Sequence, residues 1–352
     1  MKREESQALR GFAILGIVLH NYCHFLNFAV KENEYIFYGD RPRQFWDMLM
    51  SMDSQLFVHV FSFLGHYGVP VFLFVSGFGL VMKYEKDDIC YNPFRWMGYH
   101  YLKLLRLMII GYVVFIAVYS SRHPAEVTSA FSWDKVVAQL TMVINFVFKH
   151  PDKAILPGPY WFFGLMVQLY ALYILVVRRW RSWKCVCLLI VLSWLLQMAA
   201  MYCYTTSPRL LNYIRYNFVG GVLPFCLGVL YARYGRDLRK MHYLLVVIVS
   251  AVAVLVGSLW FHTWLWVPLF VVAGALATVK LLPSWALGAS AWMGGVSAAL
   301  FVMHPVVREV VIAHYRKVDV GYGIAIYLLA AVALALLLQY VLKMIPQAKL
   351  KR

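Results

Sequence analysis

Two histidines one helical turn apart are the residues of this chain best suited to chemistry. His20 and His24 belong to an apolar run, and His20 stands between Leu19 and Asn21. A neutral imidazole, whose ordinary pKa is about 6.5, can take a proton from a hydroxyl group near neutral pH. A histidine in an apolar run gains nothing from lipid, so its ring should face the protein interior or a water-filled cavity. His20 is thus the candidate general base; a histidine bonded to another helix for packing is the alternative.

The second histidine raises the question of a metal ion. A His-x-x-x-His pair lies on one face of a helix and can bind a metal. The sequence offers no convincing third ligand near the pair, so we expect no metal site. We expect His24 instead to orient its neighbour, to contact the substrate or to meet the outer head groups of the membrane.

A segment of small and aromatic residues, 68–79, carries the candidate Ser76. Small residues let helices approach closely, and its proline frees a backbone carbonyl that can face a cavity. Ser76 stands about six residues from the inner end of its apolar run, at an expected depth similar to that of His20. Plain small-residue packing is the alternative.

Basic residues near apolar runs suit the binding of phosphate groups. Arg10 is expected at the inner edge of the first run, so that His20 lies roughly 15 Å further in, close to the membrane midplane. Lys103 and Arg106 are three residues apart and so share one helix face. Such a pair can bind phosphates; an ordinary basic flank on the cytoplasmic side is the alternative.

Two further features lie in later apolar runs. Trp161 belongs to the aromatic segment 160–163, which opens a run on the expected outer side. An aromatic belt at the membrane surface is the alternative to a substrate contact for this segment. His304 precedes Pro305 late in another run and is a second candidate for substrate binding.

The composition shows which elements must position these residues. Hydrophobic residues make up 62% of the 352 residues and charged residues 14%, against about 45–50% and roughly 25% in soluble domains. The apolar residues come in runs long enough to cross a bilayer as helices, and strict alternation typical of a β-barrel is absent. The net charge of +17 does not indicate nucleic-acid binding, because the basic residues lie between runs. Topology and anionic lipids account for them.

The runs predict an all-α, polytopic membrane helix bundle of about ten spans in one domain, 1–352. The stretch 136–148 is too short to cross and should be an interfacial or buried helix. With that assignment the basic clusters gather on one side, which places both termini in the cytoplasm. No internal repeat or separate soluble domain is evident. The predicted spans are 11–30, 56–82, 104–120, 160–177, 185–203, 216–232, 243–261, 264–280, 289–307 and 321–342.

Taken together, these segments resemble the family-3 membrane acyltransferases, which modify polysaccharides, lipopolysaccharide and other cell-surface glycans. The segment from Leu9 to His20 is similar to the family's first-span motif, with nine residues between arginine and histidine where many members have ten. Lysine stands at 103, where arginine is usual. The spacing leaves both His20 and His24 open as the catalytic histidine. The other similar segments, in chain order, are 68–78, 103–106, 161–170 and 297–306.

The resemblance implies acyl transfer across the membrane, with no permanently bound cofactor. Acyl-CoA, most often acetyl-CoA, would enter from the cytoplasm with its phosphates near Arg10, Lys103 and Arg106. A glycan or glycolipid hydroxyl would approach from outside. His20 would act as general base or briefly carry the acyl group, with Ser76 near the thioester. The expected location is the cell membrane, in particular the bacterial inner membrane.

A transporter or flippase for a lipid-linked or small substrate is the alternative function. Such a protein would also have many spans, a midplane histidine and helices broken by proline and glycine. The missing internal repeat and the scarcity of acidic residues within the runs disfavour it.

Overall fold

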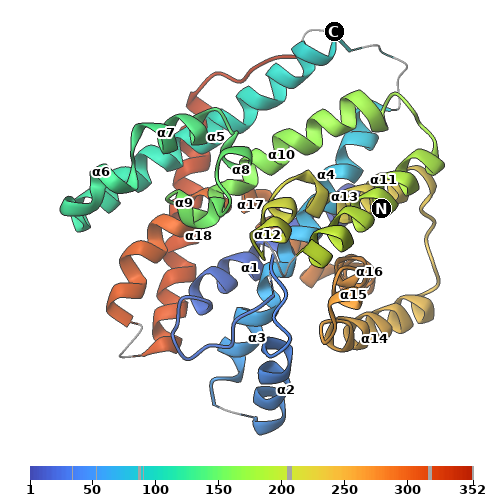
Figure 1. The fold of residues 1–352 in the computed structure, drawn as a ribbon, viewed down its shortest axis with the longest axis horizontal. Coiled ribbons are helices and arrows are strands. Elements are labelled where there is room, and N and C mark those ends of the chain that lie inside the picture. Colours follow the sequence, from blue (N-terminus) through green and yellow to red (C-terminus); the bar gives the residue numbers. More distant parts are fainter. Residues whose placement is uncertain are drawn as a thin grey trace. The chain divides into compact units, whose positions relative to one another are not determined.

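The computed structural model describes residues 1–33, 35–52, 54–85, 89, 91–203, 208–315 and 319–350. These residues form helices and connecting segments without any strand (Figure 1), as the predicted all-α class requires. They divide into two compact units. The first unit comprises residues 1–83, 223–297 and 320–324, and the second comprises 84–222, 298–319 and 325–352.

The first unit contains the N-terminal helices and a central group from the later half of the chain. Four helices, α4, α13, α17 and α18, include residues of both units. The helices of the first unit are α1 (Arg3–Cys23), α2 (Arg41–Ser51), α3 (Leu56–Leu64), η1 (Gly65–Tyr67), α4 (Gly68–Tyr84), α13 (Phe218–Tyr234), α14 (Lys240–Gly257), α15 (Phe261–Trp264), α16 (Val267–Leu281) and the first part of α17 (Ser284–Tyr315).

The second unit is built around α5 and α10, which pack against each other. Its elements are α5 (Pro93–Arg122), η2 (Pro124–Glu126), α6 (Val127–Ala130), α7 (Trp133–Leu140), α8 (Ile144–Val147), α9 (Pro151–Ala154), η3 (Gly158–Tyr160), α10 (Trp161–Leu172), the π-helical turn η4 (Tyr173–Val177), α11 (Trp183–Tyr202), α12 (Pro208–Tyr216), the second part of α17 and most of α18 (Val320–Met344).

Seven helices of the described residues are long and apolar enough to cross a membrane, or eight if α12 and α13 form one bent span. The prediction of a membrane helix bundle is confirmed, whereas the number ten is not. Of the predicted spans, 264–280 corresponds to α16, which has only 15 residues. The run 11–30 corresponds to α1, which ends at Cys23 and carries four charged residues in its first eight. The stretch 136–148 forms parts of the short helices α7 and α8, as predicted.

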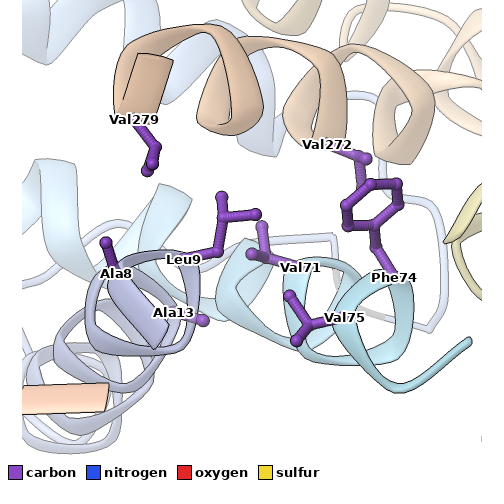
Figure 2. Packing of buried hydrophobic residues seen from close by; sticks show 8 residues of the cluster. All are labelled: Ala8, Leu9, Ala13, Val71, Phe74, Val75, Val272 and Val279. Carbon is purple, nitrogen blue, oxygen red and sulfur yellow. The ribbon is translucent and has the colours of Figure 1, made fainter. Parts of the chain in front are cut away.

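Helices α1, α4 and α16 meet in a buried apolar cluster of the first unit. Figure 2 shows Leu9 of α1, Val71 of α4 and Val272 of α16 among the side chains that point into it. Leu9 and Val71 are at most 4% exposed, so van der Waals packing against neighbouring helices stabilises both side chains. This cluster fixes α1 alongside α4.

Glycines set the closest helix approaches in the first unit. A Cβ atom added at Gly11 of α1 would overlap the carbonyl oxygen of Ser290 in α17, and one at Gly294 would overlap that of Gln7. Helices α4 and α13 approach each other in the same reciprocal way through Gly77 and Gly228. The close approach predicted for the segment 68–79 is therefore confirmed.

Charged side chains join helix ends within each unit. In the first unit, the ammonium of Lys280 lies 3.1 Å from the carboxylate of Glu5 and 2.5 Å from that of Asp237. In the second unit, Arg178 donates to the carbonyl oxygens of Tyr84, at 3.2 Å, and of Ile89. These segments are ones that the distribution of basic residues predicts on the cytoplasmic side, and that side stays a prediction.

Candidate active site

His20 is buried in a polar environment near the C-terminal end of α1. The residue is only 7% exposed. Its Nδ1 lies 3.0 Å from the carbonyl oxygen of Ser62, a residue in the last turn of α3. A carbonyl can only accept, so Nδ1 carries the hydrogen and Nε2 keeps its lone pair. The ring thus holds the tautomer that a base acting through Nε2 needs.

The local sequence explains why the two helices come close enough for this bond. A Cβ atom added at Gly65 would lie 2.8 Å from the Cβ of His20 and 2.5 Å from the carbonyl oxygen of Gly16. Only glycine fits this approach between η1 and α1. Helix α3 ends at Leu64 and is followed directly by η1. A carbonyl oxygen has two lone pairs, so the Ser62 carbonyl can accept the hydrogen bond from His20.

A buried carboxylate, Glu32, completes the site and was missed by the sequence analysis. One of its oxygens lies 4.0 Å from Nε2 of His20, and the other lies 2.8 Å from Nδ1 of His24. Glu32 is 3% exposed, whereas the side chain of His24 is 34% exposed. The three groups form a cluster that is closed around Glu32 and more open at His24.

Hydrogen bonds fix the segment that carries Glu32. The ammonium of Lys31 donates to the carbonyl oxygens of His24 and, at 2.9 Å, of Leu26. The guanidinium of Arg41 donates to the backbone oxygen of Glu32 itself. The hydroxyl of Ser62 donates to the carbonyl of Val30 at 2.7 Å. Ser62 therefore holds both His20 and the segment before Glu32, which makes the cluster a pre-organised unit.

The histidines keep Glu32 ionised despite its burial. Burial alone disfavours a charged carboxylate, but the attraction of a protonated His20 ring and the hydrogen bond from His24 outweigh it. Together they hold the pKa of Glu32 well below its usual range. When His20 is neutral, its bare Nε2 faces the negative carboxylate, and a cation placed between the two groups is favoured.

The expectation that no third ligand lies near the histidine pair is wrong. Three possible ligand atoms, one each from His20, His24 and Glu32, lie within 4.8 Å of one another. Glu32 follows His24 by eight positions and is brought back by a non-helical turn, which no helical spacing rule reveals.

Ser76 lies far from His20, and the expectation of a shared depth is wrong. Helices α1 and α4 run antiparallel, since Gly65 meets His20 whereas Gly68 meets Ala13. Ser76 is eleven residues beyond Gly65, or about 16 Å along the helix. Its hydroxyl donates to the Phe72 carbonyl at 2.8 Å. The predicted depth of His20 takes Arg10 as the residue at the membrane edge. Helix α1 already begins at Arg3, so Arg10 does not lie at that edge.

Arg10 and Ser76 share one end of the first unit instead. A Cβ atom added at Gly79, three residues after Ser76, would lie 3.9 Å from a terminal nitrogen of the Arg10 guanidinium. The Arg10 side chain thus reaches α4 about one helical turn beyond Ser76.

The two residues of the predicted basic pair, Lys103 and Arg106, have different surroundings in the second unit. Lys103 is exposed on α5. Arg106 donates to the carbonyl oxygen of Leu342 in the last turn of α18 and, at 2.7 Å, to that of Ile345, the residue after this helix. Carbonyls of a last helical turn lack a partner within the helix, so Arg106 caps α18 in addition to any contact with a ligand.

We predict different effects on stability for the two basic residues. Arg106→Ala should lower the free energy of unfolding by about 1.5–3 kcal/mol, because charged hydrogen bonds to the α18 carbonyls are lost. Lys103→Ala should change it by less than about 0.5 kcal/mol, as is usual for exposed residues. Thermal unfolding of the two purified variants in detergent measures the difference. Equal midpoints would show that the α18 cap contributes nothing.

Trp161 and His304 are both buried in the second unit. Trp161 is 5% exposed, and its ring packs edge-on against Tyr216 at 5.1 Å between centroids. Its neighbours Tyr160 and Phe163 are at most 2% exposed, so most of this segment is not a belt facing the membrane surface. Nδ1 of His304 donates to the carbonyl of Leu300 at 3.1 Å within α17. This bond again leaves Nε2 as the acceptor nitrogen.

Comparison with known proteins identifies the kind of chain to which these residues belong. A family model described as an acyltransferase domain, that of acyltransferase family 3, matches residues 4–343. No curated protein and no solved structure matches the chain. The matched residues include both compact units and every candidate residue from Arg10 to His304.

Proposed function

The chain belongs to acyltransferase family 3, and we propose that it moves an acyl group from acyl-CoA to a hydroxyl of a glycan or glycolipid across the membrane. Acetyl is the acyl group expected. The protein is a membrane acyltransferase by its family and its apolar helices. The donor, the acceptor and the location in a bacterial inner membrane are parts of the proposal.

The observation that carries the proposal is the fixed tautomer of His20 beside Glu32. The carbonyl of Ser62 holds the hydrogen on Nδ1, and Nε2 lies 4.0 Å from an ionised oxygen of Glu32. A base of this kind is ready to take a proton, and the resulting imidazolium is stabilised by the neighbouring negative charge. Glu32 thereby acts as the charge partner of His20.

The proposed reaction has two proton transfers. Nε2 of His20 takes the proton of the acceptor hydroxyl as the hydroxyl oxygen attacks the thioester carbonyl. The carbon–sulfur bond then breaks, and the CoA sulfur leaves with the electron pair and takes the proton from Nε2. An ester and free CoA thiol result, and His20 returns to its neutral form. His24 holds Glu32 in place through its hydrogen bond of 2.8 Å.

The donor is proposed to bind from the end of α1 that carries Arg10. The guanidinium of Arg10 lies next to Gly79 of α4, and Ser76 is one helical turn away. Guanidinium and hydroxyl groups both donate to phosphate oxygens. The pantetheine arm of CoA is long enough to extend from this end toward the level of His20. Within the second unit, Lys103 and Arg106 are proposed, on the family resemblance, as phosphate-binding residues, and Arg106 also caps α18. Trp161 and His304 are proposed for the acceptor.

Acetyl-CoA labelled in its acetyl group tests the proposal. Purified protein in detergent should release free CoA thiol and transfer label to an added glycan or, more slowly, to water. A transporter would instead move labelled substrate across a vesicle membrane without breaking the thioester. The proposed function would be contradicted if acetyl-CoA stayed intact with every hydroxyl acceptor and labelled substrate entered the vesicles instead.

A further inference from the structure

We propose that Nε2 of His20, Nδ1 of His24 and the carboxylate of Glu32 form a zinc site, and that a zinc ion bound there blocks acyl transfer. The binding of zinc rests on the geometry alone. The block rests on the proposed function, because the ion would occupy the nitrogen that acts as base.

The three ligands match the preferences of zinc. Catalytic and regulatory zinc ions commonly bind two histidines and one carboxylate and leave a fourth position for water. One ligand atom from each residue lies within 4.8 Å of the other two, against roughly 3.3 Å between ligand atoms around a tetrahedral zinc. The shortest contacts of Glu32, 4.0 Å to His20 and 2.8 Å to His24, use its two different oxygens. Side-chain shifts of roughly 1–2 Å would bring all three ligand atoms to zinc distance.

The surroundings already orient the ligands. Histidine ligands of metals usually donate their other ring hydrogen to a carbonyl or carboxylate, which fixes the ring. His20 makes such a bond to Ser62. Glu32 is held through its own backbone oxygen by Arg41 and through its neighbour Lys31. The ammonium and guanidinium groups of these residues donate to backbone carbonyls, so neither occupies the space between the ligand atoms.

Charge and access also favour a cation. A buried carboxylate facing the lone pair of a neutral imidazole is relieved by any positive charge between them. The proton that His24 donates to Glu32 can be replaced by the ion, with the ring hydrogen of His24 moving to Nε2. The 34% exposure of the His24 side chain provides a way in, while Glu32 stays shielded from competing water.

Titration of the chelator-treated, full-length protein with zinc chloride tests the binding. Calorimetry should show one zinc ion per chain, and cobalt(II) should give the visible absorption of a four-coordinate site. Glu32→Gln keeps the side-chain size but removes the charge and should weaken binding at least about tenfold. His24→Gln, at the exposed side of the cluster, should do the same if Glu32→Gln fails to fold. The exposed His242 on α14 gives a matched control, His242→Gln, with unchanged affinity.

Transfer from acetyl-CoA with and without zinc tests the block. Zinc at its binding concentration should stop transfer by the wild type, and a chelator should restore it. Equal zinc affinity in Glu32→Gln, His24→Gln and wild type would overturn the zinc site and leave the proposed function standing. Zinc that binds and speeds transfer would overturn the block and the role of His20 as base. If no sample transfers acetyl, the proposed function and the block both fail, while the titration still decides whether zinc binds.

Discussion

Replacement of His20 by glutamine should lower the rate of acyl transfer by about 10²–10⁴-fold, the usual contribution of a general base. The glutamine amide can still donate to the carbonyl of Ser62, so the contact between α1 and α3 is kept while the basic nitrogen is lost. Release of CoA thiol from acetyl-CoA measures the rate. Size-exclusion chromatography and thermal unfolding show whether the variant is folded.

Two companion variants distinguish the groups of the cluster. Glu32→Gln should lose less activity than His20→Gln, because it removes only the charge that stabilises the imidazolium. The exposed His314 on α17, outside the cluster, gives the control His314→Gln with wild-type activity. If His20→Gln transfers normally and His24→Gln does not, the base is one helical turn further along α1. Normal transfer by both would show that the mechanism is wrong.

Gly294→Ala should lower the free energy of unfolding by about 1–3 kcal/mol or more, the cost of overpacking a tight contact. The added methyl group would overlap the carbonyl oxygen of Gln7, and both partners belong to helix backbones that cannot turn aside. The midpoint of thermal unfolding, followed by tryptophan fluorescence in detergent, measures the change.

The adjacent glycine supplies the matched control. A Cβ atom at Gly295 meets no atom within 4 Å, so Gly295→Ala should stabilise the helix by up to about 1 kcal/mol, the difference in helix propensity. The two variants carry the same chemical change one residue apart. Equal unfolding midpoints would contradict the close approach of α1 and α17.

Much of the fold could be predicted because the membrane imposes it. Long apolar runs must become helices in lipid, and Leu56–Tyr84 or Ser284–Tyr315 follow directly from that requirement. The burial of His20 among polar groups follows from the cost of exposing an imidazole to hydrocarbon. The glycines of α4 could be predicted as contact positions because few other residues allow helices to approach so closely.

Other parts of the site could not be predicted, for two physical reasons. Glu32 lies in a non-helical segment whose path is fixed by Arg41 and by Trp264, which donates to the Asn33 carbonyl at 3.1 Å. No periodic pattern encodes such a path. The predicted common depth of Ser76 and His20 depends on where α1 begins, and the charged residues at the start of α1 conceal about two further turns of helix. Depth counted from a sequence therefore fails when a helix extends beyond its apolar part.

The reciprocal glycine contacts have a consequence for how the chain can vary. Where α1 meets α17 and α4 meets α13, each glycine is pressed against main-chain atoms of the opposite helix. Such a contact does not depend on which residue supplies the main-chain atoms. These contacts therefore put little constraint on the side chains of the residues that supply the main chain, whereas each needs glycine on the opposite helix. The glycines are Gly11, Gly294, Gly77 and Gly228.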